Sequence, residues 1–319
     1  MSISEPAASG RNSTAQNRWV RPLLPLLIIA IAAIVLLYLG GFVATAQGAT
    51  DDAALPLSRW LGVIAATAVI LYGLYVGLAA KPIWQFGTRE VVYAAIGAAL
   101  YGVLSWATNI IQLPSISLVA LRPAVVIPVF FGIAFGPLVG FFSGFVGNVL
   151  GDALTGWGVY PLWDVGNGLM GLVPGLIVAF STRRRALDVV TIVVAALSLL
   201  ATLLLVTNAS FTVTDFNGNE NPVGPLWWLP LLGGVLAVGA RYLFAKREEL
   251  AAAEVWGALG IIIGIGFAAF GGVFQNGTSP ALAFFGEFVP AAGSNLINVL
   301  ILLPILLTAW TAARARSGR

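Results

Sequence analysis

Hydrophobic residues follow one another along this chain in long unbroken runs, separated by short polar or charged segments. The runs are about 20 residues long and show no alternation of apolar and polar positions, which is the length that an α-helix needs to cross a bilayer. Only helices and closed barrels satisfy every backbone hydrogen bond inside lipid. The pattern therefore predicts an all-α fold, a polytopic membrane helix bundle.

The runs predict about ten transmembrane helices. The expected spans lie at about 23–46, 59–80, 90–111, 122–134, from the glycine-rich stretch to 154, around the segment NGLMGLVPGL, 186–208, 226–245, 252–274 and 288–310. The fourth span is short, and its boundary with the fifth falls at Gly136-Pro137. The segment Ala44-Thr45-Ala46 resembles a signal-peptide cleavage site, but the preceding run is long for a signal peptide, so we expect an uncleaved helix.

The composition agrees with a membrane helix bundle and limits the kinds of site that the chain can form. The 319 residues are 59% hydrophobic and 9% charged, with a mean hydropathy of +0.95. The chain has no Cys and no His, which excludes disulfides, thiol chemistry, His-based metal sites and Ser-His-Asp triads. We expect no catalytic residues and no metal site, and the net charge of +3 does not indicate binding to nucleic acid.

The distribution of charge predicts an orientation in the cell membrane. With the N-terminus inside, 13 of the 16 basic residues fall at cytoplasmic ends of the spans, whereas Asp51, Asp52, Asp215 and Glu220 fall outside. Cytoplasmic loops of membrane proteins carry an excess of Lys and Arg. The pattern therefore predicts that both termini are cytoplasmic.

One stretch, GIAFGPLVGFFSGFVGNVLG from Gly132 to Gly151, places glycines four residues apart. Residues four apart share a helix face, so Gly136, Gly140 and Gly144 predict a groove without side chains. In lipid such a groove lets another backbone approach closely. Spacing alone is equally consistent with a tight helix contact that has no functional role.

Polar residues near the outer ends of the fifth and sixth spans are candidates for binding a substrate. Asn148 and Asp152 follow the glycines, Asp164 and Asn167 open the sixth span, and Arg122 begins the fourth. An ionisable group inside a membrane costs about 2.5–3.5 kcal/mol on insertion scales and usually faces a cavity or partner. The alternatives are an interfacial cap for Asp152, a favourable helix dipole for Asp164, and a structural ion pair or headgroup contact for Arg122.

Aromatic and amide residues complete the candidate set. Trp157, Tyr160 and Trp163 lie near the outer surface and are expected either to stack on a planar heterocycle or to form an aromatic belt. Asn295 and Asn298 lie three apart in the last span. We expect these two amides either to contact the substrate or to form interhelical hydrogen bonds.

From Glu90 onward the chain resembles the substrate-binding S component of energy-coupling factor (ECF) vitamin transporters. The resemblance covers most of residues 88–180 and 252–310, and it rests on the segments AAIGAALYG, LRPAVVIPVFFGIAFGPLVGFFSGFVGNVLGD, NGLMGLVPGL and FVPAAGSNLINVLILLPILL. The family core has six spans. The resemblance therefore implies an S-component-like domain at 88–310 with a two-helix insertion at 186–245, two added helices at 18–81, a disordered cytoplasmic tail at 1–17 and a basic cytoplasmic tail at 311–319.

The resemblance also implies partners. An S component binds a vitamin on the outer side, while a transmembrane coupling subunit and two ATPase subunits drive its release inward. In the family, small residues of the first core helix contact the coupling subunit; here they correspond to Ala94, Ala95, Ala98 and Ala99. The chain has no GxxxxGK[ST] motif, so the partners would use the ATP and this chain needs no cofactor. A flavin or thiamine-related compound suits the aromatic and hydrogen-bonding candidates, with riboflavin as first choice.

Two other classes of function remain open at this point. An ion-coupled secondary transporter predicts two halves with matching interrupted helices, and only one glycine-rich segment of this strength occurs. A membrane-embedded enzyme requires a catalytic cluster. Without His or Cys that cluster would be built from Asp, Glu, Ser, Lys or Tyr, and no DDxxD-type pair occurs inside a span.

Overall fold

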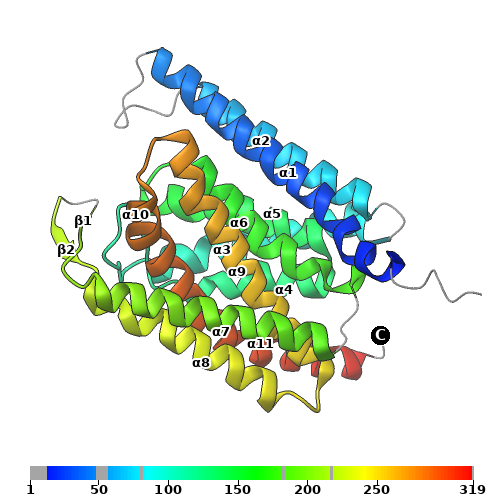
Figure 1. The fold of residues 1–319 in the computed structure, drawn as a ribbon. Helices are drawn as coiled ribbons and strands as arrows, with labels where there is room; N and C mark the ends of the chain where they lie inside the picture. The colour runs from blue at the N-terminus through cyan, green and yellow to red at the C-terminus, as the bar shows by residue number, and fades with distance from the viewer. Residues whose placement is uncertain (1–12, 48–56, 79–81, 181–183, 216–217, 318–319) are drawn as a thin grey trace, which may run out of the picture.

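The computed structural model describes residues 13–47, 57–78, 82–180, 184–215 and 218–317. Within these ranges nine helices are long and apolar enough to cross a membrane, and a shorter apolar helix spans Pro123–Phe135. The fold is all-helical apart from one small hairpin, so the predicted class and the short fourth span are confirmed (Figure 1). The chain is a multi-pass membrane protein.

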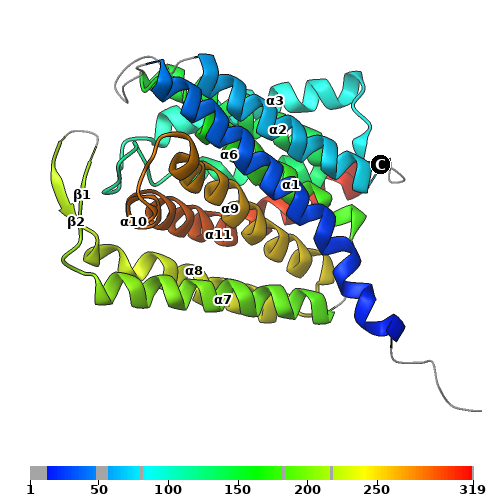
Figure 2. The ribbon, with the colours of Figure 1, turned by 45° about the horizontal axis from the view of Figure 1, so that its top comes forward.

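The two added N-terminal helices, α1 (Ser13–Ala46) and α2 (Leu57–Gly77), lie side by side and cross the bundle together (Figure 2). Part of the predicted disordered tail 1–17 lies outside the described residues, and α1 begins at Ser13. The pair is anchored on α9 (Glu248–Gln275): Gly41 lies against the backbone of Gln275, and Gln275 Nε2 donates a 2.8 Å hydrogen bond to the carbonyl of Arg59.

The six helices that the sequence predicted as the S-component-like core are α3 (Thr88–Thr108), α4 (Val126–Phe135), α5 (Pro137–Thr155), α6 (Pro161–Gly175), α9 and α11 (Val289–Ser317). Short 3-10 turns flank them at Pro82–Trp84, Pro123–Val125 and Leu176–Ala179. Before α11 come α10 (Pro280–Leu282) and a π-helical segment, Ala283–Phe288. The predicted basic tail 311–319 continues α11 as far as Ser317.

The glycine stretch forms two helices. Gly136 has φ +112°, a conformation that favours glycine, and it ends α4 just before Pro137 begins α5. Gly136 therefore does not share a helix face with Gly140 and Gly144, and that part of the prediction is wrong. The close approach itself is confirmed, because a Cβ on Gly140 or Gly144 would overlap the backbone of α6.

The segment between α7 (Arg184–Thr207) and α8 (Trp228–Leu243), expected to be a loop, contains two antiparallel strands, β1 (Thr212–Thr214) and β2 (Glu220–Pro222), followed by a 3-10 turn, Gly224–Trp227. Its β-branched residues favour strands. Val213 and Val223 are buried against Phe285 and Val289, which fixes the hairpin on the core.

Helices α7 and α8 form a second pair of neighbouring helices. Arg241 is buried and makes a 2.7 Å ion pair with Asp188 that joins the two helices. Gly293 of α11 lies against Leu229, which brings α8 onto the core. Side chains such as Leu61, Ile192 and Leu199 are exposed on the flanks, as expected for surfaces that face lipid.

All the turns that carry the polar candidates lie at the end of the bundle that bears β1 and β2, which we call the hairpin end (Figure 1). Helices α3, α5, α7 and α9 end there, and α4, α6, α8 and α11 begin there. The described C-terminal residues lie at the opposite end.

Candidate functional site

The contact between α5 and α6 positions the first set of candidate residues. Gly144 faces the backbone of Asn167, and Gly140 faces the backbone of Gly171. Without side chains between them, the two helices approach closely enough for Asn148 of α5 to reach Asp164 of α6. The Asn148 Nδ2 atom lies 2.9 Å from Asp164 Oδ1.

Arg122 joins the end of α3 to α5. Its Nε atom donates to Asn109 Oδ1 at 2.8 Å, and its Nη1 atom donates to Asn148 Oδ1 at 2.8 Å. Its Nη2 atom lies 3.5 Å from Asp152 Oδ1. The fixed fork of the guanidinium thus contacts three side chains at once.

Asn148 lies at the centre of this cluster. Its amide also donates to Asp152 Oδ2 at 2.8 Å, so it links both carboxylates to Arg122. We call the five residues Asn109, Arg122, Asn148, Asp152 and Asp164 the Arg122 network. Asn109, Asn148, Asp152 and Asp164 are buried, and the side chain of Arg122 is only 11% exposed.

Two buried carboxylate oxygens of the network, Asp152 Oδ1 and Asp164 Oδ2, have no hydrogen-bond partner among the described residues. Asp164 is 0% exposed, and its Oδ2 atom has no hydrogen-bond partner among the described residues. The cluster contains two carboxylates and one guanidinium, and buried polar groups without partners are costly. The arrangement can therefore accept a hydrogen bond from a ligand, or bind a proton and donate one.

Asn167 lies one turn beyond Asp164 and belongs to a separate contact. Its Oδ1 atom accepts a short hydrogen bond from the hydroxyl of Tyr101, which is fully buried on α3. Its Nδ2 atom donates to the carbonyl of Trp163 at 2.8 Å. Both sides of its amide are thus satisfied by the protein.

The three aromatic candidates do not gather at one place. The Trp157 ring lies beside Arg122, with the guanidinium carbon 5.7 Å from the ring centroid. The Trp163 side chain packs against the main hydrophobic core. Tyr160 is exposed just before α6. Of the three rings, that of Trp157 is the one that the described structure places against the Arg122 guanidinium.

Asn295 and Asn298 of α11 do not join the network by any hydrogen bond among the described residues. Asn295 is buried, and its Nδ2 atom lies 3.9 Å from the Met170 sulfur. The Nδ2 atom of Asn298 is buried without a partner in that part of the chain. These amides lie inside the bundle, on the helix that packs against α9.

The four alanines of α3 divide into two faces. Ala94 and Ala98 are buried, and the carbonyl of Ala98 lies against Gly147 of α5. Ala95 and Ala99 are exposed on the opposite face, beside Ile96 and Val103. Only Ala95 and Ala99 are placed where a partner subunit can touch them.

Asn109 and Tyr101 were missed by the sequence reasoning. Asn109 stands at the end of a predicted span, where an amide is common, and Tyr101 follows four alanines in a mostly apolar helix. Their roles depend on the register between α3 and α5, which a periodic pattern does not determine.

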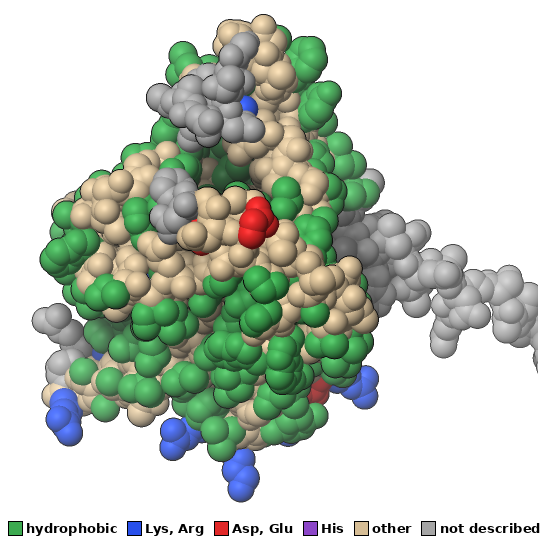
Figure 3. Space-filling model, turned by 90° about the vertical axis from the view of Figure 1, so that its left-hand side faces the viewer, with side chains coloured by type: hydrophobic (Ala, Val, Ile, Leu, Met, Phe, Trp, Pro, Cys, Tyr) green, Lys and Arg blue, Asp and Glu red, His purple; other side chains and the backbone are tan. Residues whose placement is uncertain are grey.

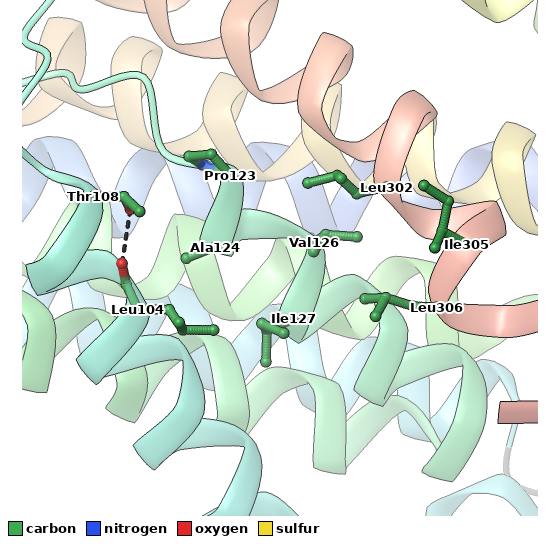
Figure 4. Close-up of a pocket in the computed structure, with 9 residues that line it drawn as sticks. All are labelled: Leu104, Thr108, Pro123, Ala124, Val126, Ile127, Leu302, Ile305 and Leu306. Atoms are coloured by element: carbon green, nitrogen blue, oxygen red, sulfur yellow. Dashed lines mark hydrogen bonds between the residues drawn. The ribbon is translucent and has the colours of Figure 1, made fainter. Parts of the chain in front are cut away.

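An apolar groove of about 250 Å³ lies between α3, α4 and α11 (Figure 4). Leu104, Ala124, Ile127 and Leu302 are among the residues that line it. Its one hydroxyl, on Thr108, donates to the carbonyl of Leu104 at 2.7 Å. The lining of this groove is apolar and does not suit a polar vitamin. The described residues hold no group of three or more His, Cys, Asp or Glu side chains that could bind a metal ion.

Comparisons with known proteins give a family match for the middle of the chain. Residues 85–222 match the family model described as ECF-type riboflavin transporter, S component. A UPF0397 protein of Vibrio atlanticus (strain LGP32) is 38% identical over 100 residues, which are 31% of this chain and 54% of that protein. A UPF0397 protein of Aliivibrio salmonicida (strain LFI1238) is also 38% identical over 100 residues, with the same coverage of both chains.

The chain spans about half the length of the curated relatives that it matches. No solved structure matches it. The family match runs from just before α3 to β2 and includes the whole Arg122 network. It ends before α9, so the resemblance seen in residues 252–310 stays a prediction. The resemblance that the sequence predicted is confirmed for the matched part: residues 85–222 are similar to the S component of ECF-type riboflavin transporters.

Proposed function

We propose that this protein is the substrate-binding subunit of an ECF-type transporter and captures a water-soluble vitamin at the hairpin end. The observation that carries the proposal is the family match over residues 85–222. The name of the matched family favours riboflavin as the substrate, and a thiamine-related compound is the second choice.

The Arg122 network supports a polar ligand at this end of the bundle. It is buried, it is held between α3, α4, α5 and α6, and it keeps one carboxylate oxygen of Asp164 without a partner in the described structure. A ligand with a hydrogen-bond donor would satisfy that oxygen. Buried ionisable groups at membrane depth usually serve a substrate path or a partner.

The basic residues support an outward-facing hairpin end. Arg89, Arg184, Arg247 and Arg314 lie at or near helix ends on the opposite side of the bundle. Cytoplasmic ends of membrane helices are enriched in Lys and Arg. The proposed orientation places both termini in the cytoplasm and the candidate site toward the outside.

The sequence has no GxxxxGK[ST] motif, and the proposal therefore assigns ATP hydrolysis to two partner ATPases. A transmembrane coupling subunit would contact the exposed face of α3 at Ala95 and Ala99. In a close helix contact, small residues let two backbones approach within lipid.

A binding titration tests the proposed substrate. The purified protein is titrated into riboflavin while the flavin fluorescence is recorded, and thiamine is measured in parallel by tryptophan fluorescence. We expect saturable binding of one riboflavin per chain. Folded protein that binds neither compound would exclude both proposed substrates, and binding of thiamine alone would replace riboflavin with a thiamine-related substrate.

A further inference from the structure

One carboxyl group lies deep in the bundle without a partner. Acidic side chains are exposed on the face of the hairpin end, where water solvates them (Figure 3). Glu254 of α9 differs from these, because it is only 1% exposed. Neither of its carboxyl oxygens has a hydrogen-bond partner among the described residues.

The position of Glu254 along α9 places it within the membrane-spanning part of the helix. The helix begins at Glu248, at the end of the bundle opposite the hairpin end, and six residues of α-helix rise about 9 Å. The flanking side chains are buried on every side of the helix: Ala251, Ala252, Ala253 and Val255. The carboxyl group is therefore separated from water and headgroups in this conformation.

The helices around this carboxyl group present apolar side chains. Gly257, about one turn later, lies against Leu303 of α11 and Val129 of α4. Leu187 of α7 forms a buried cluster with Val255. The surroundings of the carboxyl group are therefore those of a hydrophobic core.

The charged groups on the elements packed against α9 do not balance a charge at Glu254. Arg241 of α8 pairs with Asp188 of α7 at 2.7 Å, and Arg184 pairs with Glu248 at 3.2 Å. Helix α4 carries no charged residue, and the acids Asp164 and Glu287 lie at the hairpin end. The other titratable groups on these elements and on the turn between α8 and α9 are exposed: Tyr38, Arg185, Tyr242, Lys246, Arg247, Glu249, Arg314 and Arg316.

These surroundings favour a neutral carboxylic acid. An isolated ionised carboxylate is far more costly to bury than an uncharged polar group. The O–H of the neutral acid can donate to a backbone carbonyl, which has a second lone pair even within a helix. A metal ion would need several oxygen ligands, and Glu254 is the only residue from Ala251 to Ala258 with a side-chain oxygen.

We propose that Glu254 is a proton-binding site. Its carboxyl group carries a proton while α9 is packed against its neighbours, and loss of that proton loosens α9 at the end of the bundle opposite the hairpin end. The packing of α9 then depends on pH. This inference goes beyond substrate capture at the hairpin end and does not depend on which vitamin is bound.

Infrared spectroscopy of the full chain in lipid vesicles tests the site, because a protonated carboxyl group has a C=O stretching band distinct from the bands of a carboxylate. The unchanged protein at neutral pH is compared with Glu254→Gln, whose neutral amide has nearly the same shape. We expect this variant to fold and to lack one protonated-carboxyl band. Glu249→Gln is the matched control, since Glu249 is exposed in the first turn of the same helix, and it should keep that band.

Thermal unfolding at several pH values supplies a second readout. An exposed carboxyl group of the unfolded chain is ionised at neutral pH, so the folded protein binds one proton more than the unfolded chain. Its stability should therefore fall as the pH rises. Between mildly acidic and alkaline pH, the melting temperature of the unchanged protein should fall further than that of Glu254→Gln.

Three results would overturn the inference, whether or not the protein binds riboflavin. The first is a folded Glu254→Gln protein with the same protonated-carboxyl bands as the unchanged protein. The second is failure of Glu254→Gln to fold, since an uncharged group of the same shape should fit where a neutral acid fits. The third is an equal fall in melting temperature for both proteins, which would show that proton loss at Glu254 does not loosen α9.

Discussion

The Nη2 atom of Arg122 lies 3.5 Å from Asp152 Oδ1, and both side chains are almost completely withdrawn from the surface. Arg122 comes just before the 3-10 turn that leads into α4, and Asp152 lies near the end of α5. Their contact therefore ties the connection after α3 to the helix that carries the glycines. The pair is part of the fold as well as part of the candidate site.

Removing Arg122 should destabilise the protein strongly. Arg122→Gln leaves Asp152 and Asp164 buried without the guanidinium, and breaking a buried ion pair costs about 3–5 kcal/mol. We expect a clear fall in melting temperature, which thermal unfolding of the detergent-solubilised protein measures. The double variant Arg122→Gln with Asp152→Asn should be more stable than Arg122→Gln alone. Additive losses in the double variant would show that the two side chains are not coupled.

Asp152→Asn should weaken substrate binding and should destabilise the protein less than Arg122→Gln does, because Asp164 still supplies a carboxylate to the cluster. Asn148 and Asn109 still bind Arg122 in this variant, so the network keeps two of its contacts. A buried hydrogen bond to a charged group is worth about 1.5–3 kcal/mol, which corresponds to roughly a ten- to hundredfold loss of riboflavin affinity. Fluorescence titration with expression level as the control measures both properties. Unchanged affinity in a well-folded variant would remove Asp152 from the binding site.

Much of the fold could be predicted from the hydropathy pattern, because a membrane requires helices of a fixed length. The polar candidates Arg122, Asn148, Asp152 and Asp164 could also be predicted, since charged and amide groups stand out in apolar spans. Which of these residues contact one another could not be predicted from the sequence. Those contacts depend on helix register, so Asn109 was missed, and the exposure of the Tyr160 side chain could not be predicted.

The β1–β2 hairpin shows a second limit of the sequence pattern. Strands of three residues, Thr212–Thr214 and Glu220–Pro222, are too short to give a periodic signal. Their position is fixed by tertiary burial of Val213 and Val223 against the π-helical segment. Local polarity alone therefore predicted a loop.

Gly144→Ala should disturb the α5–α6 contact. The new methyl group would overlap the carbonyl of Asn167, and only a shift of one helix relieves the overlap. We expect a loss of about 1–3 kcal/mol, typical of overpacking, together with weaker substrate binding because Asn148 and Asp164 move apart.

Gly239→Ala is the control for that substitution, since a Cβ at this helical position meets nothing within 4 Å. It should leave stability unchanged or raise it by about 0.4–1 kcal/mol. Thermal unfolding of both variants compares their stabilities. Equal effects at the two positions would show that the α5–α6 contact is not as close as described.

The two faces of α3 should respond differently to bulky residues. Ala95→Trp and Ala99→Trp place a large ring on the exposed face, and we expect them to impair association with a coupling subunit while substrate affinity stays unchanged. Ala98→Trp fills a buried position against α5 and should reduce the yield of folded protein. Co-purification with the coupling subunit, paired with riboflavin titration, separates these outcomes. Normal association of both exposed-face variants would place the docking surface elsewhere.

The central claim is that this chain binds its substrate and depends on partner subunits for accumulation. The most direct measurement is uptake of labelled riboflavin by liposomes that contain this chain alone, with proton or sodium gradients imposed across the membrane. We predict retention of about one riboflavin per chain, as expected for a single binding site, and no concentrative uptake under any gradient. Gradient-driven accumulation inside the liposomes would contradict the account and identify the protein as a secondary transporter.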